Sequence, residues 1–151
     1  ASRAETVRNG VSTLLEQGLA EAQDNILVHD AARCCLPAEA LTRLLDEAGE
    51  NDEGGILAIP VADTLKRSDG SHHIDETVAR AGLWQAQTPQ LFQTALLNRA
   101  LSVDDLSEIT DEASAVEKLG IRPRLVQGDT RNLKLTLPQD EYIVRLLLKA
   151  V

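Results

Sequence analysis

Aromatic residues are almost absent from this sequence. They make up 2% of its 151 residues, and methionine does not occur at all. A hydrophobic core must therefore be built from leucine, isoleucine, valine and alanine. The hydrophobic content of 43% and the charged content of 26% are ordinary for a globular protein. A chain of this length can bury a real core, and we expect residues 1–151 to form a single domain.

Positive charge is also scarce. The chain carries 15 lysines and arginines against 24 acidic residues, which gives a net charge of −9. This balance argues against a nucleic-acid backbone or an anionic membrane as the main partner. No apolar run approaches the roughly 20 residues that a membrane-spanning helix needs, and no basic-then-apolar leader opens the sequence. We therefore expect a soluble protein that binds neither nucleic acid nor membrane.

Cysteine occurs only as the neighbouring pair Cys34 and Cys35. Adjacent cysteines rarely form a good disulfide, and no spaced cysteine framework exists, so we expect a reducing, cytoplasmic environment. A metal or redox site at this pair stays open as an alternative, although no further cysteine or histidine cluster supports it. His72 and His73 lie beside a turn, where we interpret them as solvated residues rather than metal ligands.

Alternating helical and strand patterns predict an α/β fold. Ser2 and Glu5 fit a capping box at the start of a first helix, and a short apolar strand follows over 25–29. A second helix is expected from Pro37, and the continuous apolar run over 56–61 is typical of a strand covered on both faces. This order predicts a Rossmann-like, mostly parallel sheet with crossover helices.

The segment 63–80 differs from its surroundings. Two polar, β-branched stretches flank a Ser-Asp-Gly-Ser turn, which predicts a protruding β-hairpin arm. An isolated hairpin is marginal in water, so we expect this arm to pack on a partner subunit. The remaining elements are expected to be a short strand and turn over 83–89, a helix over 92–101, a helix capped by Thr110, strands over 122–127 and 133–136, and a helix that begins at Pro138.

The clearest candidate site follows the strand over 25–29. That strand ends at Asp30, and Arg33 comes three residues later. Ligands of open parallel sheets bind outside the carboxyl ends of the strands. An aspartate there can hold Mg²⁺ together with substrate phosphates, and Arg33 can clamp a phosphate through two hydrogen bonds. The alternative that Asp30 only caps the next turn stays open.

Other cationic and hydroxyl side chains could complete a phosphate site. The set consists of Arg3, Arg80 and Lys134 with the hydroxyls of Thr6, Thr64, Thr88 and Thr110. It could surround one or two phosphate groups, with Asp30 placing a cation between them. The sequence contains no Gly-x-Ser-x-Gly motif, no Cys-His-Asn arrangement and no zinc-ligand spacing, which argues against a hydrolase or a zinc enzyme.

Five motifs occur in order along the chain and carry a family resemblance. They are Val28-His29-Asp30-Ala31-Ala32-Arg33, Asp63-Thr64-Leu65-Lys66, Leu83-Trp84-Gln85-Ala86-Gln87-Thr88-Pro89-Gln90, Thr110-Asp111-Glu112-Ala113-Ser114 and Asn132-Leu133-Lys134-Leu135-Thr136. Together they closely resemble the 2-C-methyl-D-erythritol 4-phosphate cytidylyltransferases, over essentially the whole chain. The resemblance implies a fold of the nucleotide-diphospho-sugar transferase type. It also implies cytidylyl transfer from CTP to methylerythritol phosphate, with release of pyrophosphate, in non-mevalonate isoprenoid biosynthesis.

The resemblance also implies roles for the candidate residues. Ser2, Arg3 and Thr6 match a segment that contacts the cytidine and ribose of CTP, and Asp30 matches the acid beside the triphosphate and a divalent metal such as Mg²⁺. Arg80 and Lys134 match a catalytic pair that holds the attacking phosphate. Thr64, Thr88 and Thr110 match hydroxyls that line its pocket. The arm matches a homodimer-forming arm, from which Thr64 and Arg80 would reach the neighbouring subunit's site.

The sequence departs from the family at its start. The family begins with a strand and a glycine-rich loop, and nothing in these 151 residues matches them. By resemblance, roughly the first third of such an enzyme is missing. Two alternatives therefore stay open beside the leading hypothesis: a related cytidylyltransferase acting on another polyol phosphate, such as ribitol 5-phosphate, and a non-catalytic fragment that dimerises through its arm.

Overall fold

Helices and strands alternate through the first half of the chain, which confirms the α/β class. The computed structural model describes residues 2–150. In chain order the elements are α1 (Arg3–Glu16), β1 (Asn25–Val28), α2 (Ala38–Ala48), β2 (Gly55–Pro60), β3 (Leu65–Ser68), β4 (Ile74–Val78), β5 (Trp84–Gln93), α3 (Thr94–Leu101), α4 (Glu112–Glu117), β6 (Arg124–Gln127) and α5 (Asp140–Lys149). None of these helices is both long enough and apolar enough to cross a membrane.

The central sheet is mixed, with the strand order β1-β5-β2-β6. Strand β5 runs antiparallel to both β1 and β2, and only β2 and β6 are parallel. The expectation of a mostly parallel sheet is therefore wrong for the described strands. The reason is the path of the chain: it leaves β2 into a hairpin and returns directly as β5, and a strand that returns beside its predecessor in this way runs antiparallel.

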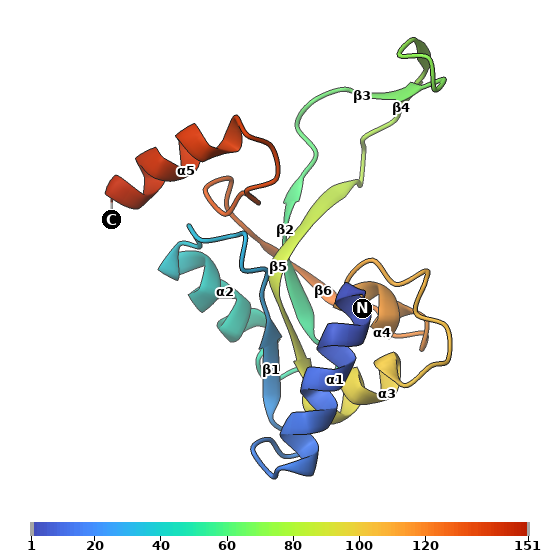
Figure 1. Ribbon diagram of the computed structural model, residues 1–151, viewed down its shortest axis with the longest axis vertical. Helices are drawn as coiled ribbons and strands as arrows, with labels where there is room; N and C mark the ends of the chain where they lie inside the picture. The colour runs from blue at the N-terminus through green and yellow to red at the C-terminus, as the bar shows by residue number, and fades with distance from the viewer. Residues whose placement is uncertain (1, 151) are drawn as a thin grey trace.

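Figure 1 shows helices on both faces of the central sheet. Two groups of buried side chains hold them there. Successive residues of a strand point to opposite faces. In β2, Ile56 and Ala58 pack with residues of α1, α3 and α4, whereas Leu57 packs with α2. Strand β5 repeats the pattern, because Phe92 joins the first group and Leu91 the second. Each fully buried leucine or phenylalanine stabilises this arrangement by about 1.5–3 kcal/mol.

Strand β5 is irregular where it passes β2. The two strands lose register between Ile56 and Ala58. Ile56 pairs with Gln90 and Ala58 pairs with Ala86, so β5 uses four residues where β2 uses two. The extra residues form a bulge, which bends a strand and turns its side chains in new directions. Gln87 and Thr88 lie in this bulge. The turn expected at 83–89 is thus an irregular stretch inside a longer strand, in which Pro89 can be accommodated.

Strands β3 and β4 form a separate two-stranded antiparallel sheet within the segment 63–80. Figure 1 shows this hairpin extending away from the end of the central sheet. Most of its residues are exposed, including Ile74.

Three local expectations are wrong for physical reasons that the structure shows. Helix α4 is capped by Asp111 rather than Thr110, because the Asp111 carboxylate accepts a hydrogen bond from the backbone N–H of Ser114 at 2.8 Å. Helix α3 begins at Thr94, since the preceding residues remain in β5. Residues 133–136 form no strand, because their alternating pattern has no neighbouring strand to pair with; the N–H of Leu135 bonds instead to the carbonyl of Ala32.

Candidate functional site

A polar cavity of about 270 Å³ opens near the end of β1. Its lining combines three cationic side chains, two acidic ones, two threonines and two glutamines. The lining residues are Arg3, Asp30, Arg33, Ala86, Gln87, Thr88, Gln90, Thr110, Asp111 and Lys134. Residues distant in sequence thus meet at one end of the sheet, as expected for a ligand site in an α/β protein.

A larger cavity of about 700 Å³ lies at the base of the hairpin. Its lining includes Asp63 and Asp129 but no lysine or arginine. An anionic ligand such as a phosphate has no counter-charge there. The smaller cavity is therefore the better candidate for phosphate chemistry, in spite of its size.

Asp30 is the centre of the polar cavity, and three cations surround its carboxylate. Oδ1 lies 3.0 Å from Nη2 of Arg3, and Oδ2 lies 3.4 Å from Nε of Arg33 and 3.7 Å from Nζ of Lys134. Burial raises the pKa of Asp30, but the hydrogen bond and charge of Arg3 and the charge of Lys134 outweigh it and hold that pKa below its usual value. Asp30 is therefore a carboxylate already neutralised by protein cations.

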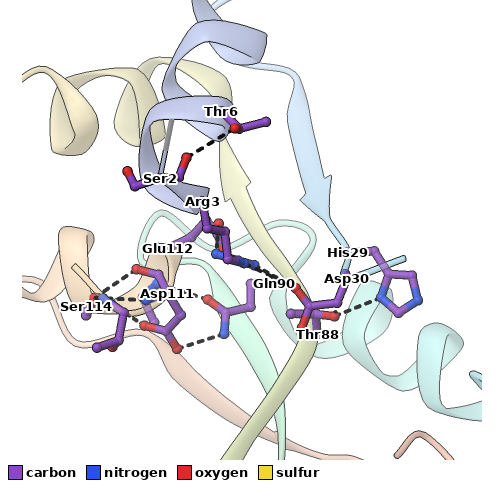
Figure 2. A network of polar contacts seen from close by, with 12 residues as sticks. Ser2, Arg3, Thr6, His29, Asp30, Thr88, Gln90, Asp111, Glu112 and Ser114 are labelled. Atoms are coloured by element: carbon purple, nitrogen blue, oxygen red, sulfur yellow. Dashed lines mark hydrogen bonds and ion pairs between the residues drawn. The ribbon is translucent and has the colours of Figure 1, made fainter. Parts of the chain in front are cut away.

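Arg3 enters the site from the first turn of α1. The capping box predicted at Ser2 and Glu5 is present and fixes where this helix begins. The Arg3 guanidinium bridges Asp30 and Glu112, with Nη1 2.6 Å from Oε1 of Glu112 (Figure 2). Burial lowers the pKa of Arg3, but the hydrogen bonds and charges of the two carboxylates outweigh it and raise that pKa. Arg3 thus joins α1 to α4 across the site.

Gln90 holds the start of α4 against β5. Its Nε2 donates to Oδ2 of Asp111 at 2.9 Å, and its Oε1 accepts from the backbone N–H of Ala113 at 2.9 Å. Gln90 is buried, so these bonds replace water that it cannot reach. They place Glu112 where Arg3 meets it, as Figure 2 shows.

The loop that carries Lys134 is held by Asn132, which is fully buried. Nδ2 of Asn132 donates to the carbonyl of Thr88 at 2.7 Å and to Oε1 of Gln87 at 3.2 Å. Nη1 of Arg33 donates to the carbonyl of Asn132 at 2.7 Å. Lys134 itself is about half exposed, so its ammonium group can turn from Asp30 to an incoming ligand.

The structure brings together most of the residues predicted from sequence. Five of them, together with Arg33, line the polar cavity; the five are Arg3, Asp30, Thr88, Thr110 and Lys134. Thr6 lines an adjoining hollow with Arg3, Asp30 and Lys134. Ser2 lines neither, and its hydroxyl oxygen accepts from the N–H of Glu5.

Thr64 and Arg80 lie apart from this group. Both are exposed residues near the base of the hairpin, and neither lines the polar cavity of its own chain. Nη1 of Arg80 donates to the carbonyl of Val61 at 3.2 Å and to that of Ala62. Within one chain, the structure therefore does not bring these two residues into the polar cavity.

Sequence reasoning missed the buried polar residues of the site. Gln87, Gln90 and Glu112 are each no more than 5% exposed. A usable signal was present, because four glutamines within the strand 84–93 are unusual for a segment that also contains a buried apolar run.

The fit of a divalent metal depends on Asp30. Within residues 2–150 there is no group of three or more histidine, cysteine, aspartate or glutamate side chains that could hold a metal ion. Mg²⁺ needs only one or two carboxylates when substrate phosphates supply further oxygens. Asp30 could take that limited role only together with substrate phosphates, since its surrounding cations would disfavour a metal ion that arrived without them.

The fold and the cavity define the class of protein: an α/β protein with a polar cavity in which cationic and hydroxyl side chains surround one carboxylate. The chain belongs to the 2-C-methyl-D-erythritol 4-phosphate cytidylyltransferase (IspD) family, whose model matches residues 1–150.

Individual relatives agree with this family assignment. The chain is 73% identical over 150 residues to the 2-C-methyl-D-erythritol 4-phosphate cytidylyltransferase of Neisseria gonorrhoeae (strain NCCP11945). It is 74% identical over 150 residues to the protein of that name from Neisseria meningitidis serogroup C / serotype 2a (strain FAM18). Each match covers 99% of this chain and 65% of the relative, so the chain spans slightly less than two thirds of their length.

A solved structure has the same fold. The crystal structure of a 4-diphosphocytidyl-2C-methyl-D-erythritol synthase matches with a TM-score of 0.94 and 72% sequence identity. This match covers 98% of the chain and 68% of the solved structure.

Proposed function

We propose that the protein transfers a cytidylyl group from CTP to 2-C-methyl-D-erythritol 4-phosphate, in non-mevalonate isoprenoid biosynthesis. A phosphate oxygen of the acceptor attacks the α-phosphorus of CTP. The bond between that phosphorus and the oxygen that bridges it to the β-phosphorus breaks. The products are 4-diphosphocytidyl-2-C-methyl-D-erythritol and pyrophosphate. The family match and the names of its relatives support this reaction. The single observation that carries it is the convergence of Arg3, Arg33 and Lys134 on Asp30.

The arrangement suits an anionic nucleophile. A phosphate is already charged at neutral pH, so the reaction needs no general base, and catalysis comes from positioning and charge neutralisation. Lys134 is held only loosely by Asp30, at 3.7 Å, and can move its charge to the acceptor phosphate. In the proposed reaction Lys134 and Arg80 hold that phosphate in line with the α-phosphorus, and Thr64, Thr88 and Thr110 contact the rest of the acceptor.

We assign the CTP side of the site to the start of α1 and to Asp30. Arg3 and Thr6 line the hollow beside Asp30, which supports contacts with the cytidine and its ribose. Ser2 would contribute through the hydrogen of its hydroxyl group, since its hydroxyl oxygen and its backbone N–H are both used in the helix cap. Mg²⁺ would be bound by Asp30 together with the triphosphate and would supply charge neutralisation of the phosphates.

We further propose a homodimer in which the hairpin crosses to the neighbouring subunit. The exposure of Thr64 and Arg80, and their separation from their own chain's cavity, support this arrangement.

We also propose a cytoplasmic location. The thiols of Cys34 and Cys35 are free, which supports a reducing environment.

The proposed reaction is tested by measuring pyrophosphate release from CTP with methylerythritol phosphate or ribitol 5-phosphate as acceptor. We expect turnover with the first and at most weak competition by the second. Lys134→Ala should lower kcat/KM for the acceptor about 100-fold and change the KM for CTP by less than about threefold. Lys118→Ala, which removes an exposed lysine paired with Glu108, is the matched control. Absence of turnover, or equal losses for both substrates in Lys134→Ala, would contradict the assignment.

A further inference from the structure

His29 lies behind the polar cavity and contacts two parts of it. Its Nδ1 is 2.9 Å from Oγ1 of Thr88, and its Nε2 is 2.9 Å from the carbonyl oxygen of Arg33. The backbone N–H of Asp30 also donates to Oγ1 of Thr88, at 2.9 Å. Figure 2 shows the ring of His29 directed at Thr88. His29 lines the adjoining hollow beside Asp30 but not this cavity, so its influence on a ligand in this cavity passes through Thr88.

The direction of each hydrogen bond follows from the chemistry of the groups. A backbone carbonyl oxygen can only accept, so Nε2 of His29 carries the hydrogen that it shares with Arg33. In the neutral ring the other nitrogen, Nδ1, then has a lone pair and no hydrogen. The hydrogen in the second contact must therefore come from the hydroxyl of Thr88. The tautomer of His29 fixes which way that hydroxyl points.

Thr88 consequently has a limited capacity for a ligand. A hydroxyl group has one hydrogen and two acceptor lone pairs. The hydrogen is given to His29, and one lone pair receives the N–H of Asp30. One lone pair is left, so Thr88 can accept a hydrogen bond in the cavity but cannot donate one. It matches a ligand hydroxyl, and it does not match a phosphate oxygen, which can only accept.

We propose that His29 is a positioning residue that determines specificity by holding Thr88 as a hydrogen-bond acceptor for a hydroxyl of the polyol. This inference rests on the proposed function, because it concerns the acceptor substrate of the same cavity. Thr88 would hold the polyol hydroxyls on the side of the cavity that it lines. The acceptor's phosphate is then left to cationic groups such as Lys134, which lines the same cavity.

Two substitutions separate this role from a structural one. The His29→Asn variant would offer an amide oxygen near the position of Nδ1, so it keeps the acceptor for Thr88 and loses the bond to Arg33. The His29→Gln variant would offer an amide N–H near the position of Nε2, so it keeps the bond to Arg33 and frees the hydroxyl of Thr88 to donate. If His29 only supports the turn over 30–33, His29→Gln is the milder change; if it orients Thr88, His29→Asn is milder.

The kinetic test compares kcat/KM for methylerythritol phosphate with inhibition by inorganic phosphate. We expect His29→Gln to lower kcat/KM for the polyol phosphate about tenfold and to leave phosphate inhibition equal or stronger. His29→Asn should recover most of that loss. Thr88→Val should lose at least as much as His29→Gln. Equal weakening of polyol phosphate and inorganic phosphate in His29→Gln, or a larger loss in His29→Asn, would overturn the proposal.

A second measurement tests the orientation of Thr88 without turnover. Long-range ¹H–¹⁵N NMR of the ring of His29 in the wild-type protein reports which nitrogen carries hydrogen. We expect hydrogen on Nε2 alone, and a ring with hydrogen on Nδ1 would refute the inference even if the enzyme is active. An inactive protein with hydrogen on Nε2 would instead contradict the proposed function, and with it the assignment of a polyol to Thr88.

Discussion

Arg3 and Glu112 form the tightest ion pair of the site, with Nη1 of the arginine 2.6 Å from Oε1 of the glutamate. The Glu112 side chain is only 2% exposed, so its charge depends on Arg3 for compensation. A second bond joins Nη2 to Oε2 at 3.1 Å. This pair connects the first turn of α1 to the first turn of α4, which are more than a hundred residues apart.

Removing Arg3 should therefore cost more than the loss of a surface charge. We expect Arg3→Met to lower the free energy of unfolding by about 2–3 kcal/mol, because it leaves a buried carboxylate without its partner. Adding Glu112→Gln should restore part of this stability by removing the uncompensated charge. Urea unfolding of the two single variants and the double variant measures the coupling. Arg8→Met, in the same helix, is the control. A double variant less stable than Arg3→Met would contradict this account.

A pH dependence of stability is expected from Asp129. The carboxylate accepts hydrogen bonds from the backbone N–H of Arg131 at 2.8 Å and from its guanidinium at 2.8 and 3.0 Å. These bonds outweigh burial and hold the pKa of Asp129 below its usual value. Because the pKa is lower in the folded state than in the unfolded state, the stabilisation is present above the unfolded value, about 3.9, and is lost as the pH falls through the folded value.

Asp129→Asn isolates this contribution. The difference in unfolding free energy between the wild type and the variant should stay constant between about pH 7 and about pH 5, and should shrink as the pH is lowered below about 4. Urea unfolding at several pH values measures this difference. A difference that grows on acidification would have the wrong sign for a carboxylate with a lowered pKa.

The features predicted correctly from the sequence depend on local chemistry. The Ser2–Glu5 capping box, the strand that ends before Asp30 and the hairpin turn near Gly70 are each decided within a few residues. Several residues that came from motifs, such as Lys134, line one cavity, and their roles stay predictions. Short stretches of sequence contain the information for these features.

The features that the sequence did not predict depend on distant partners. The order of the strands places β5 between β1 and β2, and nothing in 84–93 alone specifies two antiparallel neighbours. The choice of Asp111 over Thr110 as helix cap depends on which of two good capping residues reaches Ser114. Gln90 is buried because Asp111 and Ala113 satisfy it, and a single sequence does not show those contacts.

Gly128 should be intolerant of a side chain, and the consequence should appear at Lys134. A Cβ there would collide with Oε1 of Gln87, a buried group that also accepts from Asn132. Because hydrogen bonds with Asp129 and Asn132 hold the Gln87 amide in place, we expect Gly128→Ala to disturb them and to shift the loop that carries Lys134. A shift of about 1 Å can cost about 100-fold in rate, and kcat/KM should fall by at least tenfold.

The control for this prediction is another glycine. A Cβ at Gly10 would meet nothing within 4 Å, and Gly10 lies inside α1. Gly10→Ala should raise the free energy of unfolding by about 0.5–1 kcal/mol, as expected for alanine in a helix, without affecting turnover. Comparable losses of activity in the two variants would show that the contact with Gln87 is not the cause.

If the two subunits share their sites as proposed, two inactive variants should restore activity to each other in a mixed dimer. If Arg80 acts in the neighbouring chain's cavity and Lys134 in its own, then Arg80→Ala and Lys134→Ala subunits have complementary defects. A mixed dimer contains one site with both residues intact and one site with neither. After subunit exchange at equal concentrations, we expect the mixture to recover about one quarter of wild-type turnover, because half of the dimers are mixed. Turnover by the mixture that stays at the average of the two variants would place Arg80 and Lys134 in the same subunit's site, or in none. Sedimentation of each variant alone confirms that the loss of turnover does not come from loss of the dimer.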